Sequence, residues 1–585
     1  MPDSPKFLSF QVPSSEIFIG LVGPVGTDTD SAVQLIQQAL ASVSYTSKHI
    51  VLSRFLPDYF EVDQSTLFKK YTGLMDAGDK LRQKLNRGDA LVQVGFAQVQ
   101  QLRDDELERA TKKNQEKAVS DPILQTPAVS PQLSRTAFIF DQLKHPDEVS
   151  TLRWTYGSAF FLVGAYTPKE IRLAQLVSRL RISHSSMKQD QIHDLAYRLM
   201  ERDEKGGKLG QNVQKTFPLS DVFVNLTNKN EALQSLRTFF ELVFGNAFHT
   251  PTRDEQGMFF AKTAALRSAD LARQIGCAIT NKDGDLLSTG CNDAAKAGGG
   301  QYWTGDSPDN RDFKRKHDAN DLAKRGMLSD LLVRLKETGK FGRKDDDENH
   351  EIDELVKSSF ADPESPLSKT ELMSVIEYFR SVHAEMAALM TAAKLGVPVK
   401  DAVLYCTTFP CHECARQIVA AGIEKVVYIE PYPKSRVAQL YPDSISVDTV
   451  VTKHVPFLPF VGIAPRQYMS LFDIGAIKRK NDDGEVIEWN AEDPTPRMPQ
   501  QSPIYMYKEQ RFLNEFGTTL TDFRKQGQHA KTGVVTNDTE TARVRSNSAK
   551  SKKSGKQHTK VDARGGKTKR RALSGRKKAN KQGKR

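Results

Sequence analysis

The sequence has 585 residues, 27% of them charged, and a formal net charge of +12, so we expect about three domain-sized units. It contains no apolar stretch long enough to cross a membrane, and its start lacks the charged-then-apolar pattern of a secretory signal. Five cysteines are too few for a disulfide framework and favour a reducing, cytoplasmic setting.

The first predicted unit is an α/β domain over residues 15–228. Residues 16–22 read as a buried strand, residues 23–30 as a loop, and residues 31–40 as an amphipathic helix. This succession is the context in which main-chain N–H groups bind phosphate. Gly23 and Gly26 are therefore candidate nucleotide-binding residues.

The rest of this unit supports the same interpretation. Further strands are predicted at 90–94, 137–140 and 159–163, and a helix at 169–182. The order of these elements resembles a P-loop kinase fold, which implies a parallel sheet. Asp141 follows one predicted strand, where either a magnesium-organising role or a helix-capping role fits.

The loop departs from a functional phosphate-binding loop at its most informative positions. Counted from Gly23, Asp28 and Thr29 stand where the Gly-Lys pair would be. Without the lysine, no positive charge holds the outer phosphates of a nucleotide, and the carboxylate of Asp28 would repel them. We therefore expect no phosphoryl transfer, and we leave open whether the loop binds a nucleotide through its main-chain N–H groups.

The second predicted unit covers residues 251–475 and begins with a helix over 253–268. Strands follow at 273–280 and 286–290, joined by a turn. Asn292 comes directly after this hairpin. Residues 304–375, rich in Asp, Lys and Arg, form an insertion that could cover an active site or an oligomer interface.

Two short motifs in this unit carry the chemistry. The first is His383-Ala-Glu385 and the second is Pro410-Cys411-His412-Glu413-Cys414. His383, Cys411 and Cys414 offer one nitrogen and two sulfurs, which suits a tetrahedral Zn²⁺ with the fourth position left for water. Glu385 lies close to this metal site without being a soft ligand, so we assign it as the catalytic proton shuttle. This pair of motifs is the signature of zinc-dependent nucleobase deaminases.

The surrounding pattern places these ligands at the starts of two helices. A helix is predicted from 383 to about 396, and a second one from about 411 to 421, between strands at 402–406 and 425–429. A helix N-terminus lowers the pKa of a thiol and so favours the thiolate that zinc binds. The alternative is a redox pair or a structural zinc site, which would need a fourth protein ligand. Cys406, on a predicted strand, reads instead as a small buried residue.

The order of helix, hairpin and motifs resembles the deoxycytidylate deaminase branch of the cytidine deaminase superfamily, over residues 251–303 and 376–430. The resemblance implies a C-terminal cytidine deaminase-like α/β/α domain in an α/β chain. It also implies that Asn292 contacts the sugar and phosphate side of the substrate, with Arg267, Ser268 and Arg273 as further substrate-binding residues. For the two arginines, a solvated helix face or a strand entry fits equally well. Cys291 and Asp293 replace the tyrosine and glycine that usually flank this asparagine.

The two units together resemble the bacterial anti-phage dCTP deaminases, over residues 15–475. This resemblance implies zinc-dependent hydrolytic deamination of dCTP and dCMP, which depletes dCTP in antiviral defence. We also expect a homo-oligomer, and we leave open whether an RNA or a protein regulates it. Two alternatives stay open. One is a metabolic dCMP deaminase of pyrimidine salvage with a regulatory domain, and the other is a nucleic-acid cytosine or adenine editing deaminase.

The excess positive charge lies at the C-terminal end of the chain. After an extension over residues 476–528, residues 529–585 contain 19 Lys or Arg against 3 Asp or Glu. This composition predicts a disordered basic tail that binds nucleic acid non-specifically by counterion release. The tail has no interleaved aromatic residues, so base stacking is not expected.

Overall fold

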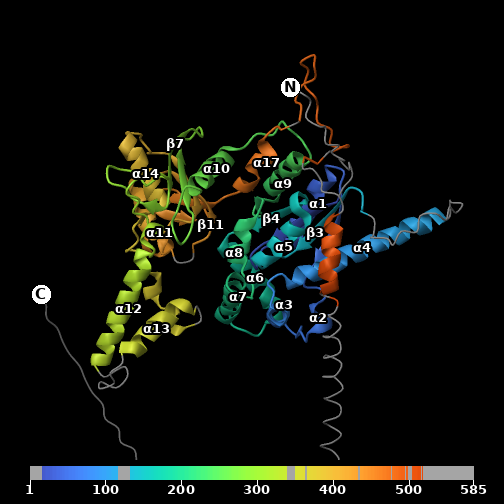
Figure 1. Cartoon of the computed structure of the whole chain (residues 1–585). Helices are drawn as coiled ribbons and strands as arrows, with labels where there is room; N and C mark the ends of the chain where they lie inside the picture. Colours follow the sequence, from blue (N-terminus) through green and yellow to red (C-terminus); the bar gives the residue numbers. More distant parts are fainter. Residues whose placement is uncertain are drawn as a thin grey trace, which may run out of the picture. The chain divides into compact units, whose positions relative to one another are not determined.

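The computed structural model describes residues 16–115, 132–207, 209–338, 349–362, 365–432, 435–475, 477–494, 496–497, 504–515 and 517. The predicted basic tail and residues 518–528 of the extension lie outside this range. The described residues belong to one compact unit, in which two six-stranded sheets are the central elements (Figure 1).

The N-terminal sheet has the strand order β14-β5-β4-β1-β3-β2. Its first five strands in the chain are β1 (Ile17–Val22), β2 (Thr46–Val51), β3 (Thr136–Asp141), β4 (Phe160–Tyr166) and β5 (Val222–Asn225). They pair in parallel throughout. Because β1 lies between β3 and β4, the loop after β1 sits where the strand order reverses, the place at which open α/β sheets bind ligands.

Helices cover this sheet and complete its core. They are α1 (Thr29–Ala41), α2 (Leu56–Tyr59), α3 (Leu67–Leu85), α4 (Ala90–Gln115), α5 (Pro146–Tyr156), α6 (Lys169–Ser183), α7 (Gln189–Glu204), α8 (Val213–Thr216) and α9 (Lys229–Val243). Leu40 of α1 and Phe240 of α9 are buried in one hydrophobic cluster with strand residues such as Ile19. The core of the N-terminal sheet therefore continues past residue 228.

The strand predicted at 90–94 is wrong, because these residues form the buried start of α4. A short apolar run fits a buried helix as well as a buried strand. Here Gly95 lets the helix approach the sheet, since a Cβ at this position would come within 2.9 Å of the Phe140 ring. Packing against the sheet therefore decides what the local pattern leaves ambiguous.

The C-terminal sheet has the order β12-β13-β11-β10-β6-β7. Its strands are β6 (Gly276–Thr280), β7 (Leu286–Cys291), β10 (Val403–Thr408), β11 (Lys425–Glu430), β12 (Ile445–Val447) and β13 (Val455–Pro459). Strand β6 runs antiparallel to both of its neighbours, β7 and β10, whereas β10, β11, β13 and β12 run parallel to one another.

Helices pack closely on both faces of this sheet, as expected for an α/β/α domain. They are α10 (Arg253–Ala265) on one face, and α14 (Ala384–Leu395) and α15 (His412–Ala420) on the other. Glycines allow the contact, because a Cβ at Gly276 would lie 1.9 Å from Ala261 O of α10, and one at Gly290 would lie 2.3 Å from Ala384 O of α14. The close approach fixes where α14, and with it His383 and Glu385, stands against the sheet.

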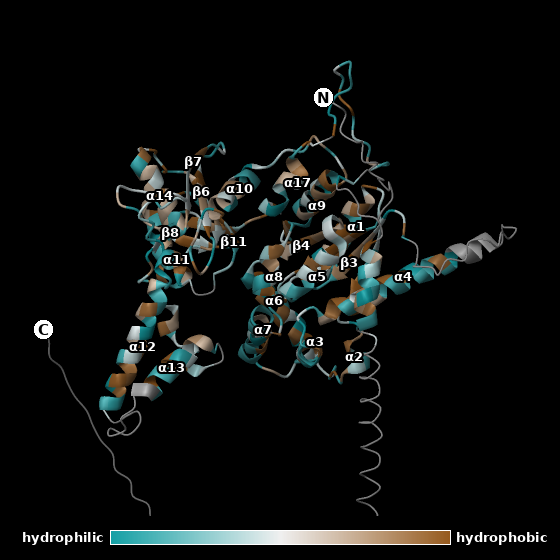
Figure 2. Cartoon of the chain, in the orientation of Figure 1, coloured by the Kyte–Doolittle hydropathy of each residue, from teal (hydrophilic) through white to brown (hydrophobic). Residues whose placement is uncertain are grey.

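The predicted insertion contains its own helical hairpin. Its helices are α11 (Asp312–Arg315), α12 (Ala319–Glu337) and α13 (Asn349–Ala361). Leu328 and Leu332 of α12 pack on Ile352 and Val356 of α13. Figure 2 shows the alternating hydrophobic and hydrophilic bands of α12 that this packing requires.

The chain after the second sheet returns to the first. Strand β14 (Gly462–Ile463) pairs antiparallel with β5, and α17 (Tyr468–Phe472) places Leu471 in the core of the N-terminal sheet. Residues 504–515 are helical, and Glu509 there forms a buried ion pair of 2.6 Å with Arg103 of α4. Segments far apart in the sequence thus join the two sheets.

Candidate active site

The three predicted metal ligands come together in the structure. Nδ1 of His383 lies 3.3 Å from Sγ of Cys411 and 3.4 Å from Sγ of Cys414. One ligand atom from each residue lies within 4.8 Å of the others. A tetrahedral zinc with the usual bond lengths separates its ligand atoms by roughly 3.5 Å, so the donor set and its spacing fit Zn²⁺.

Two helix starts present these ligands, as the sequence predicts. His383 is the N-cap residue of α14, and Cys411 is the N-cap residue of α15, where its Sγ accepts a hydrogen bond from the N–H of Cys414. Hydrogen bonds with Cys414 and His383 lower the pKa of the Cys411 thiol to about 4, and the bond with Cys411 raises the pKa of His383 to about 9. The site therefore stabilises a thiolate, the form that binds metal, at Cys411, whereas the hydrogen bond with Cys411 and burial raise the pKa of Cys414.

No fourth protein ligand is present among the described residues. The group that could hold a metal consists of His383, Cys411 and Cys414, and it does not include Cys406. Cys406 is fully buried on β10, opposite Cys277 of β6. Three protein ligands with an open position are typical of a catalytic zinc site rather than a structural one.

Glu385 lies in the first turn of α14, one residue beyond the start of the helix. Its side chain is buried, and it lines the same cavity as His383 and Cys411. Burial, together with the nearby Cys411, raises the pKa of the Glu385 carboxyl group. A carboxyl group with a raised pKa beside an open metal position is suited to take up and return a proton.

The cavity over the metal ligands has a volume of about 270 Å³. One wall comes from the deaminase-like sheet and its loops, including Arg273, Ile275 and Thr408. Tyr432 and Phe379 narrow it, and the ring of Phe379 lies edge-on to His383 at 6.1 Å between centroids. Neither aromatic residue stands in a motif, so the sequence pattern does not identify them as cavity residues.

The insertion builds the other wall of this cavity. Lys324 of α12 and residues 373–376 line it. Asn320, one helical turn before Lys324 and fully buried, donates a hydrogen bond of 2.9 Å to the carbonyl oxygen of Val375. The insertion thus covers the active site, one of the two roles considered from the sequence.

Asn292 lines the cavity from the end of the hairpin. Its side chain accepts a hydrogen bond of 2.7 Å from the N–H of Ile275 and donates one of 2.7 Å to the carbonyl oxygen of Arg273. Asn292 thus fixes the backbone of the residues just before β6, which include Arg273. Substrate contact by Asn292 stays a prediction.

Ser268 and Arg267 lie next to the cavity but do not line it. Ser268 donates a hydrogen bond of 2.6 Å to the carbonyl oxygen of Asn292 and so supports that residue. Arg267 lies over the ring of Trp303, 3.7 Å from its centroid, and donates hydrogen bonds to the carbonyl oxygens of Gln301 and Tyr302. The structure therefore brings Asn292, but not Arg267, to the site.

The loop with Gly23 and Gly26 is fixed by internal partners. Gly26 has φ of +91°, and a Cβ there would lie 2.8 Å from the carbonyl oxygen of Arg172. Buried Asp203 accepts a hydrogen bond of 2.7 Å from the N–H of Val25 and pairs with Lys144. The Asp203 carboxylate thus already accepts the hydrogen bond of the Val25 N–H, one of the groups that would otherwise face a phosphate.

Asp28 and Asp141 also have local partners. The Asp28 side chain caps α1, accepting hydrogen bonds from the N–H and hydroxyl of Ser31, and Asp141 contacts His49 at 3.0 Å. Asp28 is therefore a helix cap, a role that the sequence pattern indicated only for Asp141. Nucleotide binding by Gly23 and Gly26 stays a prediction.

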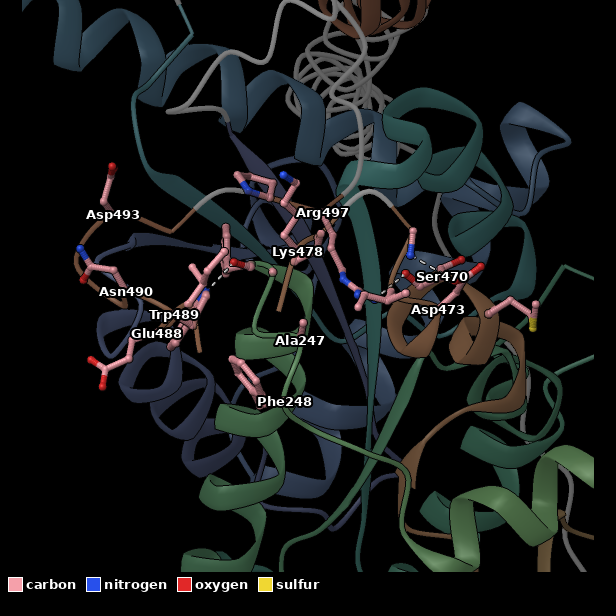
Figure 3. Close-up of a pocket in the computed structure, with 18 residues that line it drawn as sticks. Ala247, Phe248, Ser470, Asp473, Lys478, Glu488, Trp489, Asn490, Asp493 and Arg497 are labelled. Atoms are coloured by element: carbon pink, nitrogen blue, oxygen red, sulfur yellow. Dashed lines mark hydrogen bonds between the residues drawn. The ribbon is translucent and has the colours of Figure 1, made fainter. Parts of the chain in front are cut away.

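A separate cavity of about 530 Å³ lies between the end of α9, α17 and residues 477–497 (Figure 3). Trp489 donates a hydrogen bond of 2.9 Å to the carbonyl oxygen of Phe244, and the N–H of Arg497 donates one of 2.8 Å to Val243. These contacts attach the C-terminal extension to α9. None of the predicted site residues lines this cavity.

Within the described part of the chain, no helix is both long and apolar enough to cross a membrane.

Comparison with known proteins matches the region that holds the site. Residues 251–430 match the family model described as the cytidine and deoxycytidylate deaminase zinc-binding region. ComE operon protein 2 of Bacillus subtilis is 43% identical over 60 residues, 10% of this chain and 32% of that protein. Deoxycytidylate deaminase of Enterobacteria phage T4 is 42% identical over 55 residues, 9% of this chain and 28% of that protein.

Human deoxycytidylate deaminase is 43% identical over 47 residues, 8% of this chain and 25% of that protein. The chain therefore spans less than a third of the length of these relatives. A dCMP deaminase of the cyanophage S-TIM5 is matched over 36% of this chain and 100% of its own at 16% identity, but its TM-score of 0.19 carries no structural argument. The similarity to cytidine and deoxycytidylate deaminases therefore lies in residues 251–430, the segment that carries both motifs.

Proposed function

We propose that this chain is a zinc-dependent hydrolytic deaminase that converts dCTP and dCMP to the deoxyuridine nucleotides. The observation that carries the proposal is the convergence of His383, Cys411 and Cys414 on one point beside the buried Glu385, in one cavity. Three protein ligands with an open position, next to a proton-transferring carboxyl group, are the parts that hydrolytic deamination requires.

His383, Cys411 and Cys414 would hold the zinc ion, which supplies the acidity that brings a water molecule close to its deprotonated form at neutral pH. Glu385 takes a proton from the attacking water and delivers it to N3 of cytosine, while the water oxygen forms a bond to C4. Glu385 then takes the remaining proton of that water, now on the hydroxyl group at C4, and transfers it to the exocyclic amine. The C4–N bond breaks, C4 becomes a carbonyl carbon, and ammonia leaves. One carboxyl group acts first as base and then as acid.

Surrounding residues support a free nucleotide as substrate. The end of the insertion, residues 373–375, together with Ile376 and Phe379 bounds the small cavity, which suits a single base. Asn292 donates a hydrogen bond to the carbonyl oxygen of Arg273, and both residues line this cavity. With the base in the cavity, the sugar and phosphate of a nucleotide would extend out of it past these two residues. Two of the relatives described above carry the name deoxycytidylate deaminase.

A substrate panel tests this proposal. Purified full-length protein is incubated with cytidine, deoxycytidine, dCMP, dCTP, CTP and a cytosine-containing single-stranded DNA, and products are separated by chromatography. We expect dUTP and dUMP from the deoxynucleotides. Turnover of dCMP without dCTP would favour a metabolic dCMP deaminase, and uracil in the oligonucleotide would favour an editing enzyme.

We further propose that the N-terminal domain regulates the deaminase, and that the chain depletes dCTP in the cytoplasm during viral infection. The support is the fused architecture together with a phosphate loop that lacks its lysine. Dependence on infection is tested by measuring dCTP pools in phage-infected cells that express the wild type or Glu385→Ala. A fall in dCTP confined to the wild type is expected, and equal pools would contradict the antiviral role.

Regulation by the loop is tested separately with Gly26→Val. Its Cβ would clash with Arg172, so the loop must change shape at a cost of about 1–3 kcal/mol. We expect full zinc content but altered control of deamination in cells, with Gly326→Val, which meets no atom within 4 Å, as the control. Unchanged control, or phosphoryl transfer from ATP that Gly26→Val abolishes, would contradict the regulatory role.

A further inference from the structure

A larger cavity of about 750 Å³ adjoins the catalytic cavity. The two cavities share four lining residues: Arg273, Ile275, Thr408 and Tyr432. Its remaining walls come from both sheets' domains, including α8 and the end of α7 on the N-terminal side. A molecule that extends out of the catalytic cavity past Arg273 would therefore enter this second cavity.

The charge of this cavity is strongly biased. Five of its lining residues are cations and one is a carboxylate: Lys205, Lys215, Lys262, Arg273, Arg466 and Glu430. Lys205 and Lys215 belong to the N-terminal domain, whereas Lys262 lies on α10. The described residues of the cavity wall therefore carry more positive than negative charge.

Three of the five cations form no ion pair within the described residues: Lys205, Lys215 and Lys262, of which Lys262 is still attracted electrostatically by Glu430. Arg466 pairs with Asp221 at 3.2 Å. Arg273 approaches Glu430 only at 4.0 Å. Burial raises the pKa of Glu430, and the positive charges of Arg273 and Lys262 oppose that rise.

We infer that this cavity, called here the basic cavity, binds the phosphate chain of a nucleoside triphosphate whose cytosine occupies the catalytic cavity. The inference rests on the proposed function and extends it. A cytosine held beside His383 and Glu385 leaves its sugar near Asn292 and Arg273, and a triphosphate then continues among the lysines. A monophosphate is too short to use them all.

The N-terminal domain therefore completes the substrate site of the deaminase domain. Lys205 and Lys215 lie outside the family-matched segment of 251–430, so they distinguish this chain from a deaminase domain alone. Their ammonium groups make charge-assisted contacts with phosphate oxygens. This arrangement gives a physical reason why the fused chain would accept dCTP.

The test compares substrates that differ only in phosphate number. Lys205→Ala/Lys215→Ala and Lys262→Ala are assayed with dCTP, dCMP and deoxycytidine, with Arg198→Ala as the control. Arg198 of α7 is 66% exposed and pairs only with Asp194 among the described residues. We expect kcat/KM for dCTP to fall about tenfold or more in the lysine variants, mainly through KM, and kcat/KM for dCMP to fall less, whereas the control variant Arg198→Ala matches the wild type.

A binding measurement separates failure of this inference from failure of the proposed function. Glu385→Ala is titrated with dCTP by calorimetry, alone and combined with Lys205→Ala/Lys215→Ala. We expect dissociation constants about tenfold apart, with a difference that shrinks at high salt. Wild-type protein that deaminates no nucleotide would refute the proposed function alone.

Equal dCTP binding and equal kcat/KM ratios in all lysine variants would overturn the inference while leaving deamination established. Loss of oligonucleotide deamination, with dCTP turnover intact, would assign the basic cavity to nucleic acid instead and would also overturn it. Zinc content and thermal unfolding of each variant confirm that the fold is retained.

Discussion

At the scale of single residues, the proposed chemistry depends on three candidate metal ligands and one carboxyl group. His383, Cys411 and Cys414 form the group that could hold a metal, and Glu385 stays outside it. The sequence predicts this grouping, because the spacing of the motifs encodes a local geometry: each candidate ligand stands at or just after a helix start. The residues missed at this scale, such as Lys324 and Tyr432, reach the cavity only through tertiary contacts.

The choice of sulfur ligands leads to a testable difference between two buried cysteines. Cys414→Ser removes a ligand, so we expect loss of zinc and of activity. Cys406→Ser changes a buried residue that faces Cys277, so we expect about one zinc per chain to remain. Metal content is measured by mass spectrometry on purified protein. A zinc-free Cys406→Ser, or a fully loaded Cys414→Ser, would show that the ligands are wrongly assigned.

At the scale of elements, the local patterns predicted β10, β11, α14 and α15 nearly to their bounds. The first loop and its flanking strand and helix were predicted equally well. The pattern failed for residues 90–94, where an apolar run is the start of a buried helix. It also missed β2 (Thr46–Val51), an edge strand whose polar residues TSKH give little apolar signal.

The insertion shows what element patterns cannot predict. Its helices are individually regular, but their position over the cavity depends on Asn320 and its bond to Val375. Asn320→Leu leaves that carbonyl oxygen without its partner, at a cost of about 1–3 kcal/mol. We expect KM for deoxycytidine nucleotides to rise several-fold while zinc content is unchanged.

Steady-state kinetics checks this expectation, with Arg334→Ala as the control. Arg334 lies on the same helix, is 70% exposed, and pairs with Asp330. An unaltered KM in Asn320→Leu would mean that the insertion residues lining the catalytic cavity do not contact the substrate.

At the scale of the whole molecule, long-range contacts join segments that the sequence presents as separate units. Strand β14 adds to the N-terminal sheet, and residues 504–515 attach to α4 through Arg103. No local pattern predicts such contacts, since each joins residues hundreds of positions apart. The basic cavity belongs to the same class of feature, because its lysines come from two domains.

Arg103 provides a direct measure of this long-range packing. Its guanidinium is buried and pairs with Glu16 at 2.7 Å and with Glu509 at 2.6 Å. Arg103→Met leaves two buried carboxylates without their cation, so we expect a loss of about 3–5 kcal/mol of stability. Urea unfolding measures it. The exposed Arg109→Ala on the same helix should change little, and equal stability of both variants would contradict the role assigned to Arg103.

The basic C-terminal residues are predicted to act separately from catalysis. Deleting residues 528–585 removes no metal ligand and no residue of the catalytic or basic cavity. We expect turnover of dCTP to stay nearly constant and salt-sensitive binding to RNA or DNA to weaken. Filter binding at several salt concentrations, beside a kinetic assay, checks both. A large fall in turnover would place these residues at the substrate.

The central claim is that Glu385 and the three metal ligands deaminate a deoxycytidine nucleotide. The most direct measurement is the release of ammonia and dUTP from dCTP by purified full-length protein, its chelator-treated form, its zinc-restored form and Glu385→Gln. We predict equal amounts of ammonia and dUTP from the wild type, none after chelation, recovery with zinc, and a loss of more than about 100-fold in Glu385→Gln at unchanged zinc content. Zinc-loaded wild-type protein that releases neither product from dCTP or dCMP would contradict the account.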